Sequence, residues 1–522
     1  MRCCIERIIS ARYSNNGARP SPGAAMSKLA RLVELPHPTP SSIKSLLSLF
    51  DLGNRPSRFA PIPFALVLVI ALGLAGCDKP PPKPQALNLY FVSDTRGKLV
   101  PCGCFSGQYG GLTRLKTILD RADPASAIRV DVGDAIGGVE DYHVIEYRYM
   151  LQAYSSMHFD ALNLGQREAQ LPIEELRDLQ SKSPVTLISA NLLDSQTGTP
   201  ACAPWKMIQR GSCKIALVGV MDPRIAAENL GRGLTLETIE ITLGRLLPEL
   251  RHKADLIVLI AFTDEITLSR LAQDFYEIDV ILGGKVSQPA QSLEKQNRSL
   301  VFYTGNEGRA LGILRTILDP QRKLAAADHE IRLLEDRIPE DDSVRALADR
   351  YRDEVRTAKL TVDDPANLQT NMVPGVKAAA TYVDTPACVG CHASAAKVWQ
   401  DSGHAAAMET LANRKADADP DCISCHTVGF GSPSGYRREM AGSRLTDVGC
   451  ESCHGPGSLH VEQRQNHLPI TFKFRPLAAG DCQHCHYGEF SRPFDWAQFW
   501  PRIQHTKEKT NFAAIAVSGR KL

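Results

Sequence analysis

The stretch TDVGCESCHGPGSLH (residues 446–460) contains two cysteines three positions apart, and a histidine directly follows the second cysteine. The same five-residue pattern recurs along the C-terminal part of the chain. Its four copies are CVGCH (388–392), CISCH (422–426), CESCH (450–454) and CQHCH (482–486). A pattern repeated at this fixed spacing indicates four equivalent sites, which would dominate the fold of residues 380–522.

Cys-x-x-Cys-His is the attachment signature of c-type haem. Two thiols at this spacing reach the two vinyl groups of one porphyrin, and the next histidine is held under the iron as its proximal ligand. Paired zinc sites are the rival interpretation, but a histidine follows all four pairs. We therefore expect four covalently attached haem c groups. The expected thioether cysteines are Cys388, Cys391, Cys422, Cys425, Cys450, Cys453, Cys482 and Cys485, and the expected proximal ligands are His392, His426, His454 and His486.

Further histidines in this region are candidates for the sixth iron position. The strings around them, VWQDSGHAAAMETL (a helix by its pattern), CHGPGSLH and FWPRIQH, resemble those of tetrahaem cytochromes of the c-554 type. That resemblance implies that His404, His460 and His505 are distal ligands. His467 is a weaker candidate, and His484 lies inside its own motif. One iron would then be open or weakly ligated. The region has few long apolar runs, so we expect a mostly α-helical and irregular cytochrome domain with haems in its core.

The N-terminal part carries an export signal. Arg55 and Arg58 precede the apolar run FAPIPFALVLVIALGLAGC (59–77), which is shorter than a membrane-spanning helix and ends in small residues. Its last four residues resemble the lipobox of bacterial lipoproteins, which implies lipidation of Cys77. A signal anchor with an incidental cysteine is the alternative. The leader would comprise residues 1–77, and DKPPPKPQ (78–85) would be an extended tether. The prediction is an exported bacterial lipoprotein, anchored at the periplasmic face of a membrane or at the cell surface.

Residues 86–335 alternate between short apolar, β-branched runs and helical patterns, which predicts one α/β domain. Helical patterns occur in GGLTRLKTILDRA and IEELRDLQ. The predicted strands are ALNLYFVSD (86–94), AIRVDVGD (127–134), VTLISAN (185–191), KIALVGVMD (214–222), ADLIVLIAF (254–262), DVILGG (279–284) and SLVFYTGN (299–306).

The order of the motifs in this domain resembles that of metallophosphoesterases of the 5′-nucleotidase type. The chain shows SDTRG, GGLTR, VGD, LGQRE, LIVLIAFTD and ILGGKVS in that order. The resemblance implies a layered β-sandwich with flanking helices. It also implies that Asp94 and Asp134 occupy two ligand positions of a dinuclear metal site.

This chain departs from the family pattern at most other positions of the site that the resemblance implies. They are occupied by Arg96, Gln166, Arg167, Phe262, Lys285 and Ser287. Arginine and lysine are cations at neutral pH and offer no free lone pair to a metal ion. We therefore expect a vestigial site with no second metal in this domain. A metal-dependent phosphohydrolase with an atypical site remains as an alternative.

Four other cysteines lie in the same domain. Cys102 and Cys104, in Pro-Cys-Gly-Cys near the former metal site, could form a redox disulfide, bind a soft metal or face a substrate. A structural role in their loop is equally consistent with the sequence. Cys202 and Cys213 bracket a predicted hairpin, APWKMIQRGS, and a disulfide between them is expected.

Residues 336–379 are predicted to link the two domains. Val344, Leu347, Tyr351 and Val355 recur at helical spacing between Asp341 and Leu360. This spacing predicts an amphipathic helix. A polar linker with two prolines, DDPANLQTNMVPG (363–375), follows it.

Two function classes follow from the sequence. The chain of 522 residues has a net charge of +2, which gives no reason to expect nucleic acid as a partner. An envelope-anchored tetrahaem electron carrier with redox partner proteins is favoured, and its front domain would serve docking or substrate recognition. The alternative is a redox enzyme that acts on an unknown small molecule at an open haem, or at Cys102 and Cys104.

Overall fold

The computed structural model describes residues 84–101, 108–305, 307–368, 380–440, 444–471, 474–487 and 493–505. The predicted signal segment with Cys77, and the loop with Cys102 and Cys104, lie outside these residues. Among the helices of the described ranges, none combines the length and apolar character needed to cross a bilayer.

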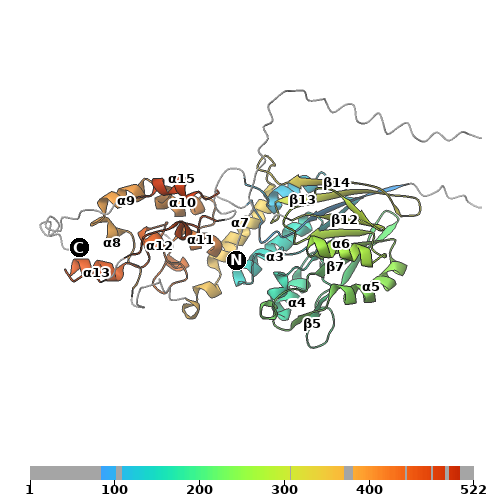
Figure 1. Cartoon of the computed structure of the whole chain (residues 1–522), viewed down its shortest axis with the longest axis horizontal. Coiled ribbons are helices and arrows are strands. Elements are labelled where there is room, and N and C mark those ends of the chain that lie inside the picture. The colour runs from blue at the N-terminus through green and yellow to red at the C-terminus, as the bar shows by residue number, and fades with distance from the viewer. Residues whose placement is uncertain are drawn as a thin grey trace, which may run out of the picture. The chain divides into compact units, whose positions relative to one another are not determined.

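The α/β domain predicted at residues 86–335, here called the front domain, contains two six-stranded sheets. Figure 1 shows its strands and helices. The first sheet has the order β14–β13–β1–β2–β3–β4. Its strands are β1 (Gln85–Val92), β2 (Ala127–Asp131), β3 (Ala161–Asn163), β4 (Leu187–Ile188), β13 (Ala310–Leu318) and β14 (Leu324–Leu333). β1 to β4 are parallel, and β13 pairs with β1 in the antiparallel direction.

The second sheet has the order β11–β12–β10–β9–β7–β6. Its strands are β6 (Trp205–Arg210), β7 (Cys213–Met221), β9 (Leu256–Phe262), β10 (Val280–Gly284), β11 (Glu294–Gln296) and β12 (Ser299–Tyr303). β7, β9, β10 and β12 are parallel. Two short strands, β5 (Leu192–Asp194) and β8 (Leu234–Leu236), form a separate pair.

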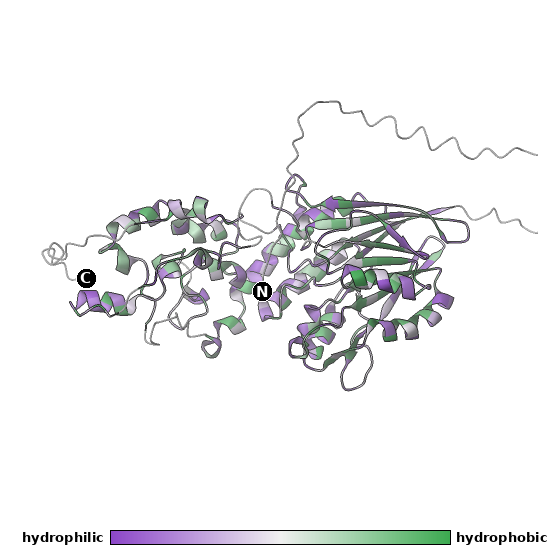
Figure 2. Cartoon of the chain, viewed as in Figure 1, coloured by the Kyte–Doolittle hydropathy of each residue, from purple (hydrophilic) through white to green (hydrophobic). Residues whose placement is uncertain are grey.

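The two large sheets share one core. The side-chain amide nitrogen Nδ2 of Asn163 on β3 donates to the backbone carbonyl of Val132, after β2, at 2.7 Å and to that of Val220 on β7 at 2.8 Å. Figure 2 shows the strands of this domain as mainly hydrophobic. All seven predicted strands are present, and the predicted layered sandwich with helices is confirmed.

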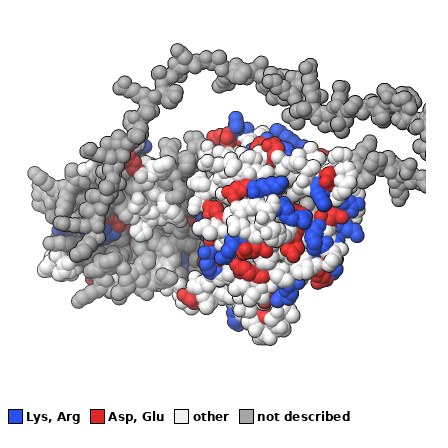
Figure 3. All heavy atoms as spheres, turned by 45° about the vertical axis from the view of Figure 1, so that its right-hand side comes forward, with Lys and Arg blue, Asp and Glu red and all other residues white. Residues whose placement is uncertain are grey.

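Helices flank the sandwich and bury their apolar sides. They are α2 (Leu112–Leu119), α3 (Asp141–Ser156), α4 (Ile173–Lys182), α5 (Ile239–Lys253), α6 (Glu265–Asp274) and α7 (Asp342–Thr357). The predicted amphipathic helix is α7, which buries Val344, Leu347, Tyr351 and Val355 and contacts α2 and α3. On the face shown in Figure 3, basic and acidic side chains are interspersed.

The predicted disulfide between Cys202 and Cys213 is wrong, since both cysteines are free. The predicted hairpin does form, as β6 and β7. Cys213 lies at the turn of the hairpin, where it pairs with Arg210. Cys202 lies before the first residue of β6, at the other end of the hairpin. Its thiol is 3.9 Å from the carbonyl oxygen of Ser189. The antiparallel register therefore separates the two thiols along the length of the hairpin.

The C-terminal region consists of short helices and turns, as predicted (Figure 1). Its α-helices are α8 (Pro386–Val389), α9 (Ala393–Gln400), α10 (Ala407–Ala412), α11 (Pro420–His426), α12 (Cys450–His454), α13 (Ser458–Gln465), α14 (Ala479–Cys482) and α15 (Trp496–Phe499). The helix expected around His404 is broken. Ser402 caps a separate 3-10 turn, Gly403–Ala406, by accepting from the His404 amide. This turn sets His404 apart from both α9 and α10.

Candidate functional site

The four Cys-x-x-Cys-His motifs occupy short helices or helical turns. The second and third motifs lie entirely in α11 and α12. Residues three positions apart share one face of a helix, so the two thiols of each of these motifs project to the same side. Gly455, directly after α12, has a φ of 80° and turns the chain. α13 begins three residues later and carries His460.

Three motif histidines each face a second histidine from elsewhere in the chain. The ring centroids of His392 and His460 are 6.1 Å apart. The centroids of His486 and His404 are also 6.1 Å apart. Those of His454 and His505 are 5.9 Å apart. The structure thus brings each of the three predicted distal histidines next to a different predicted proximal histidine.

This spacing fits one iron ion between each pair of rings. An ion bound at about 2 Å from one nitrogen of each imidazole holds the two ring centres roughly 6 Å apart. The three observed distances are 6.1, 6.1 and 5.9 Å. The core of the region also fits a bulky apolar cofactor. Its buried apolar cluster contains only Leu411, Ala416, Ile423, Val428, Tyr436 and Leu445 among the described residues.

His426, in the second motif, differs from the other three. Its Nδ1 lies 2.7 Å from the carbonyl oxygen of Ala407, which favours the tautomer with a proton on Nδ1 and leaves Nε2 free as a ligand. In the described ranges, no second imidazole is paired with its ring as in the other motifs. His467 and His484 are both exposed, and Nδ1 of His484 faces the carbonyl oxygen of Asp481.

Cysteines of different motifs lie next to one another. The thiol of Cys388 in the first motif is hydrogen-bonded to that of Cys450 in the third. The thiol of Cys425 in the second is hydrogen-bonded to that of Cys485 in the fourth. The first motif therefore lies next to the third, and the second motif lies next to the fourth.

Several residues that line these sites could not be recognised from sequence patterns. The ring of Phe474 lies 5.6 Å from that of His454 and 5.3 Å from that of His460. Phe494 and Phe499 lie 5.7 and 5.5 Å from His486. Aromatic residues are ordinary in any core, so only their proximity to the histidines identifies them.

Glu451 lies inside the third motif and has a structural role. The residue is 4 % exposed. Its carboxylate accepts hydrogen bonds from the backbone amides of Val383, Asp384 and Gly457. It therefore ties the start of the region to the turn after α12.

In the front domain, Asp94 follows β1 and is bound by an arginine. Nε of Arg96 donates to Oδ1 of Asp94 at 2.6 Å, and Nη2 donates to Oδ2 at 2.9 Å. Nη1 of Arg96 donates to Glu307 at 2.9 Å. Burial raises the pKa of Asp94, and the Arg96 guanidinium opposes that effect. A cation of the chain thus bridges two carboxylates at a predicted metal-ligand position.

Asp134, after β2, lies beside Arg167 and Glu168. Oδ1 of Asp134 accepts from the Arg167 amide at 2.8 Å. Burial and the Glu168 carboxylate raise the pKa of Asp134. The Arg167 guanidinium turns to the carbonyl of Gly137 at 2.5 Å. Asp94 and Asp134 are therefore held by groups of the protein itself.

The remaining predicted positions lie at or after the ends of β3 in the first sheet and of β9 and β10 in the second sheet. Lys285, after β10, forms an ion pair with Asp222 at 2.6 Å, and Gln166 donates to the Asp222 carbonyl at 3.1 Å. Phe262, at the end of β9, is 2 % exposed, and Ser287 is exposed. Among the described residues, no group of three or more His, Cys, Asp and Glu side chains is arranged to hold a metal ion.

The backbone around these predicted metal-ligand positions is unusual. Several non-glycine residues there adopt left-handed conformations, which L-residues rarely adopt. They are Asp94, Arg96, Asp134, Lys285 and Glu307, with φ values of 58°, 48°, 57°, 58° and 54°. Such strain clusters at functional sites and persists only where the surroundings enforce it. The surrounding structure therefore holds these residues in left-handed conformations. Their charged side chains form ion pairs with residues of the protein.

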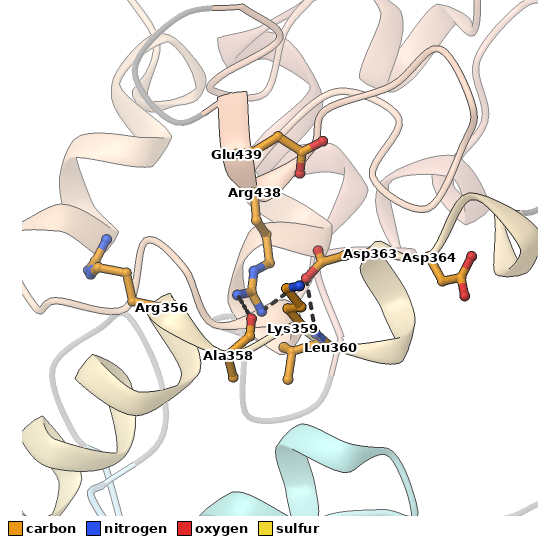
Figure 4. Close-up of a pocket in the computed structure, with 8 residues that line it drawn as sticks. All are labelled: Arg356, Ala358, Lys359, Leu360, Asp363, Asp364, Arg438 and Glu439. Atoms are coloured by element: carbon orange, nitrogen blue, oxygen red, sulfur yellow. Dashed lines mark hydrogen bonds and ion pairs between the residues drawn. The ribbon is translucent and has the colours of Figure 1, made fainter.

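A pocket of 490 Å³ lies at the end of α7, lined in part by Lys359, Asp364 and Glu439. Figure 4 shows Arg438 against Ala358 and Asp363. Its Nη2 donates to the Val355 and Ala358 carbonyls at 2.6 and 3.1 Å, so Arg438 caps the last turn of α7. This contact joins the C-terminal region to α7.

Comparisons with known proteins find two different kinds of relative for this chain. The family "Cytochrome c554 and c-prime" matches residues 387–455, which include the first three motifs. Cytochrome c-554 of Nitrosomonas europaea is 46% identical over 85 residues, covering 13% of this chain and 36% of that protein. The fourth motif lies outside the family match.

The front domain is similar to 5′-nucleotidases. That of Vibrio cholerae is 24% identical over 279 residues, covering 46% of this chain and 48% of that protein. A 5′-nucleotidase precursor structure from Thermus thermophilus has 21% identity and a TM-score of 0.47, covering 52% of this chain and 59% of that one. The chain thus spans about half the length of the curated 5′-nucleotidase and about a third of the cytochrome. It combines a C-terminal cytochrome c-554 domain with an N-terminal domain of the 5′-nucleotidase type of metallophosphoesterase fold.

Proposed function

We propose that this protein is an electron-transfer protein with four covalently attached haem c groups, three bound by histidine pairs and one with an open iron position. The observation that carries the proposal is the set of three histidine pairs with ring centres about 6 Å apart, together with the unpaired His426. The cytochrome c-554 domain supports a haem electron-transfer role.

Each proposed site uses residues of one motif and, in three cases, a distal histidine. His460 would complete the first site, His505 the third and His404 the fourth. Haem c supplies reversible one-electron chemistry at its iron. The contribution of the chain is to fix the imidazole planes, to exclude water with Phe474, Phe494 and Phe499, and to place neighbouring attachment sites in contact.

We propose that the front domain does not hydrolyse phosphate esters. Arg96 and Lys285 occupy predicted ligand positions and form ion pairs with Asp94 and Asp222. A metal ion would have to displace these cations and would also meet Phe262 in place of an imidazole. Docking or substrate recognition is the role that remains for this domain.

A second candidate function is a redox enzyme that acts on a small molecule at the second site. The observation in its favour is His426, the one motif histidine that has no partner imidazole in the described ranges. An open iron position admits an exogenous ligand, whereas two histidines block it. Cys102 and Cys104, the other proposed redox site, lie outside the described residues.

We further propose that the protein is exported and anchored through Cys77, with redox proteins of the cell envelope as its partners. Support comes from the apolar run at 59–77 and from the four haem attachment motifs. Labelling with a radioactive fatty acid tests the anchor. The Cys77→Ala variant should lose the label and leave the membrane fraction.

Iron analysis combined with electron paramagnetic resonance tests the main proposal on the mature protein from a host that attaches haem c. We expect four irons per chain, three of them low-spin and one high-spin, and no stoichiometric zinc or manganese. Fewer than four irons would refute the tetrahaem assignment. Four low-spin irons would refute the open site, and a stoichiometric second metal would refute the proposal for the front domain.

A further inference from the structure

The segment that leads into the second motif is held by the front domain and by α7. Three alternate acidic residues, Asp417, Asp419 and Asp421, immediately precede or begin α11. Arg356 of α7 binds Asp417 at 2.6 and 2.9 Å. The Tyr351 hydroxyl, also on α7, donates to Asp419 at 3.2 Å. The helix that carries Cys422, Cys425 and His426 is therefore anchored outside the cytochrome region.

Asp421 makes the contact with the front domain itself. Its Oδ2 lies 3.0 Å from Nε2 of His143 on α3, and its Oδ1 accepts from the Tyr142 hydroxyl at 2.9 Å. Nδ1 of His143 lies 2.8 Å from Glu140. The side chain of His143 is 10% exposed. An imidazole between two carboxylates makes both hydrogen bonds only when both of its nitrogens carry protons, so this geometry favours the cation.

The other side of the His143 ring rests on the loop of the former metal site. A Cβ at Gly138 would lie 2.5 Å from Nδ1, and one at Gly137 would lie 2.7 Å from Cδ2 of the ring. The carbonyl of Gly137 in turn accepts from the Arg167 guanidinium. His143 is thus in contact with the loop that carries Asp134 and with the helix of the second motif at the same time.

We propose that His143 is a positioning residue for the second haem site and supplies a positive charge beside it. The inference rests on the proposed haem attachment at Cys422 and Cys425. Asp421 lies five residues before His426 in the same helix, about 7.5 Å along the helix axis. On this helix a carboxylate without a counter-ion would stabilise the oxidised, more positive form of a haem iron bound to His426, and the His143 cation would oppose that effect.

This arrangement predicts that substitutions of His143 and Asp421 shift the midpoint potential of the second haem in opposite directions. In His143→Gln, Asp421 loses its cation, and the midpoint potential of the second haem falls. In Asp421→Asn, a negative charge disappears, and that potential rises. If the pair served only to hold the helix, both substitutions would loosen the same contact and would shift the potential in the same direction.

The measurement is a potentiometric titration of the full-length holoprotein, followed optically and by electron paramagnetic resonance. The Cys422→Ala/Cys425→Ala variant, which lacks the second haem, identifies the component that belongs to it, whether that haem is high-spin or low-spin. The other three haems serve as internal controls in every variant. His252→Gln, which changes an exposed histidine on α5, is the matched control.

We expect the midpoint potential of the second haem to fall in His143→Gln, to rise in Asp421→Asn and to stay unchanged in His252→Gln. Tyr142→Phe removes one hydrogen bond to Asp421 without changing the charge, so it should lower the midpoint potential by less than His143→Gln does. This variant tests the inference if the His143→Gln protein does not fold. Equal signs in the two main variants, or no shift in either, would overturn the inference. A low-spin second haem in the parent protein would refute the open site, and the signs of the shifts would still decide the role of His143.

Discussion

The imidazoles of His392 and His460 face each other with ring centroids 6.1 Å apart and an angle of 32° between their planes. One belongs to the first motif and the other lies just after the third. The helix that follows Gly455 therefore places His460 against a motif from another part of the chain. Chain segments distant in sequence meet at these histidine pairs.

Replacing His460 by alanine should convert the first site from a low-spin to a high-spin haem. The proximal His392 and both thioethers remain, so the haem content should stay the same. Electron paramagnetic resonance should then show twice the high-spin intensity of the parent. His467→Ala, in an exposed position nearby, is the control. An unchanged spectrum for His460→Ala would rule out His460 as the distal ligand.

The fourth motif should bind a haem although it lies outside the family match. In Cys482→Ala/Cys485→Ala, both thioether bonds of that site are lost. We expect intact-protein mass spectrometry under denaturing conditions to show three covalent haems in place of four. A mass that does not change would mean that the fourth motif carries none.

The front domain should depend on Arg96 for stability. Arg96→Met removes the hydrogen bonds to two carboxylates and leaves Asp94 partly buried without its cation. Hydrogen bonds to charged groups contribute about 1.5–3 kcal/mol. Because the Arg96 side chain is 36% exposed, we expect a loss of about 1 kcal/mol. Differential scanning calorimetry should show a lower unfolding temperature.

Lys182→Met is the matched control for this prediction. It removes an exposed ion pair with Asp178 on α4, which contributes about 0.3–0.5 kcal/mol. A loss in Arg96→Met no larger than that in Lys182→Met would show that the Arg96 network does not stabilise the domain.

Added metal should not produce phosphoesterase activity. The predicted metal positions hold Arg96, Phe262 and Lys285, so Mn²⁺ or Zn²⁺ lacks a ligand set. We expect no hydrolysis of p-nitrophenyl phosphate above that of the metal alone, measured by absorbance. A 5′-nucleotidase in the same buffers is the positive control. Turnover that depends on stoichiometric bound metal would contradict the prediction.

The contact between His143 and Asp421 should weaken as the pH rises through the raised pKa of His143. Burial lowers the pKa of His143, but the hydrogen bonds and charges of Asp421 and Glu140 outweigh this effect and raise it. A raised pKa stabilises the folded state below the unfolded value of about 6.5. That stabilisation disappears as the pH rises through the folded value.

The protonation of Asp421 sets the lower limit of the pH range in which this contact stabilises the protein. Burial raises the pKa of Asp421, but the hydrogen bond and charge of His143 outweigh it and lower the pKa. Its contribution is present above about pH 3.9 and is lost as the pH falls through the lowered value. Hydrogen-exchange protection of α11 should therefore be greatest between about pH 4 and 6.5. In His143→Gln the decline above that range should be absent, and its persistence would exclude His143 as the cause.

The sequence predicted the elements of the fold better than their long-range contacts. Short β-branched runs identified seven strands because burial on both faces favours such residues. β13, which lies beside β1, was not recognised, although it is nine residues long. The expected disulfide failed because the spacing of Cys202 and Cys213 does not reveal the register of the hairpin.

In the C-terminal region, the motifs and the three candidate distal histidines could be named from local strings. Which distal histidine faces which motif could not, because the pairing depends on how the chain folds back on itself. The contact between His143 and Asp421 joins residues that are 278 positions apart, and neither residue belongs to a recognisable motif.

The bidentate hydrogen bonds from Arg96 to Asp94 also limit how this position can be substituted. The same guanidinium binds Glu307, and Asp134 lies within its electrostatic reach. A substitution of Arg96 alone would leave these carboxylates without their shared counter-ion. A tolerated change at this position therefore requires matching changes among its acidic partners.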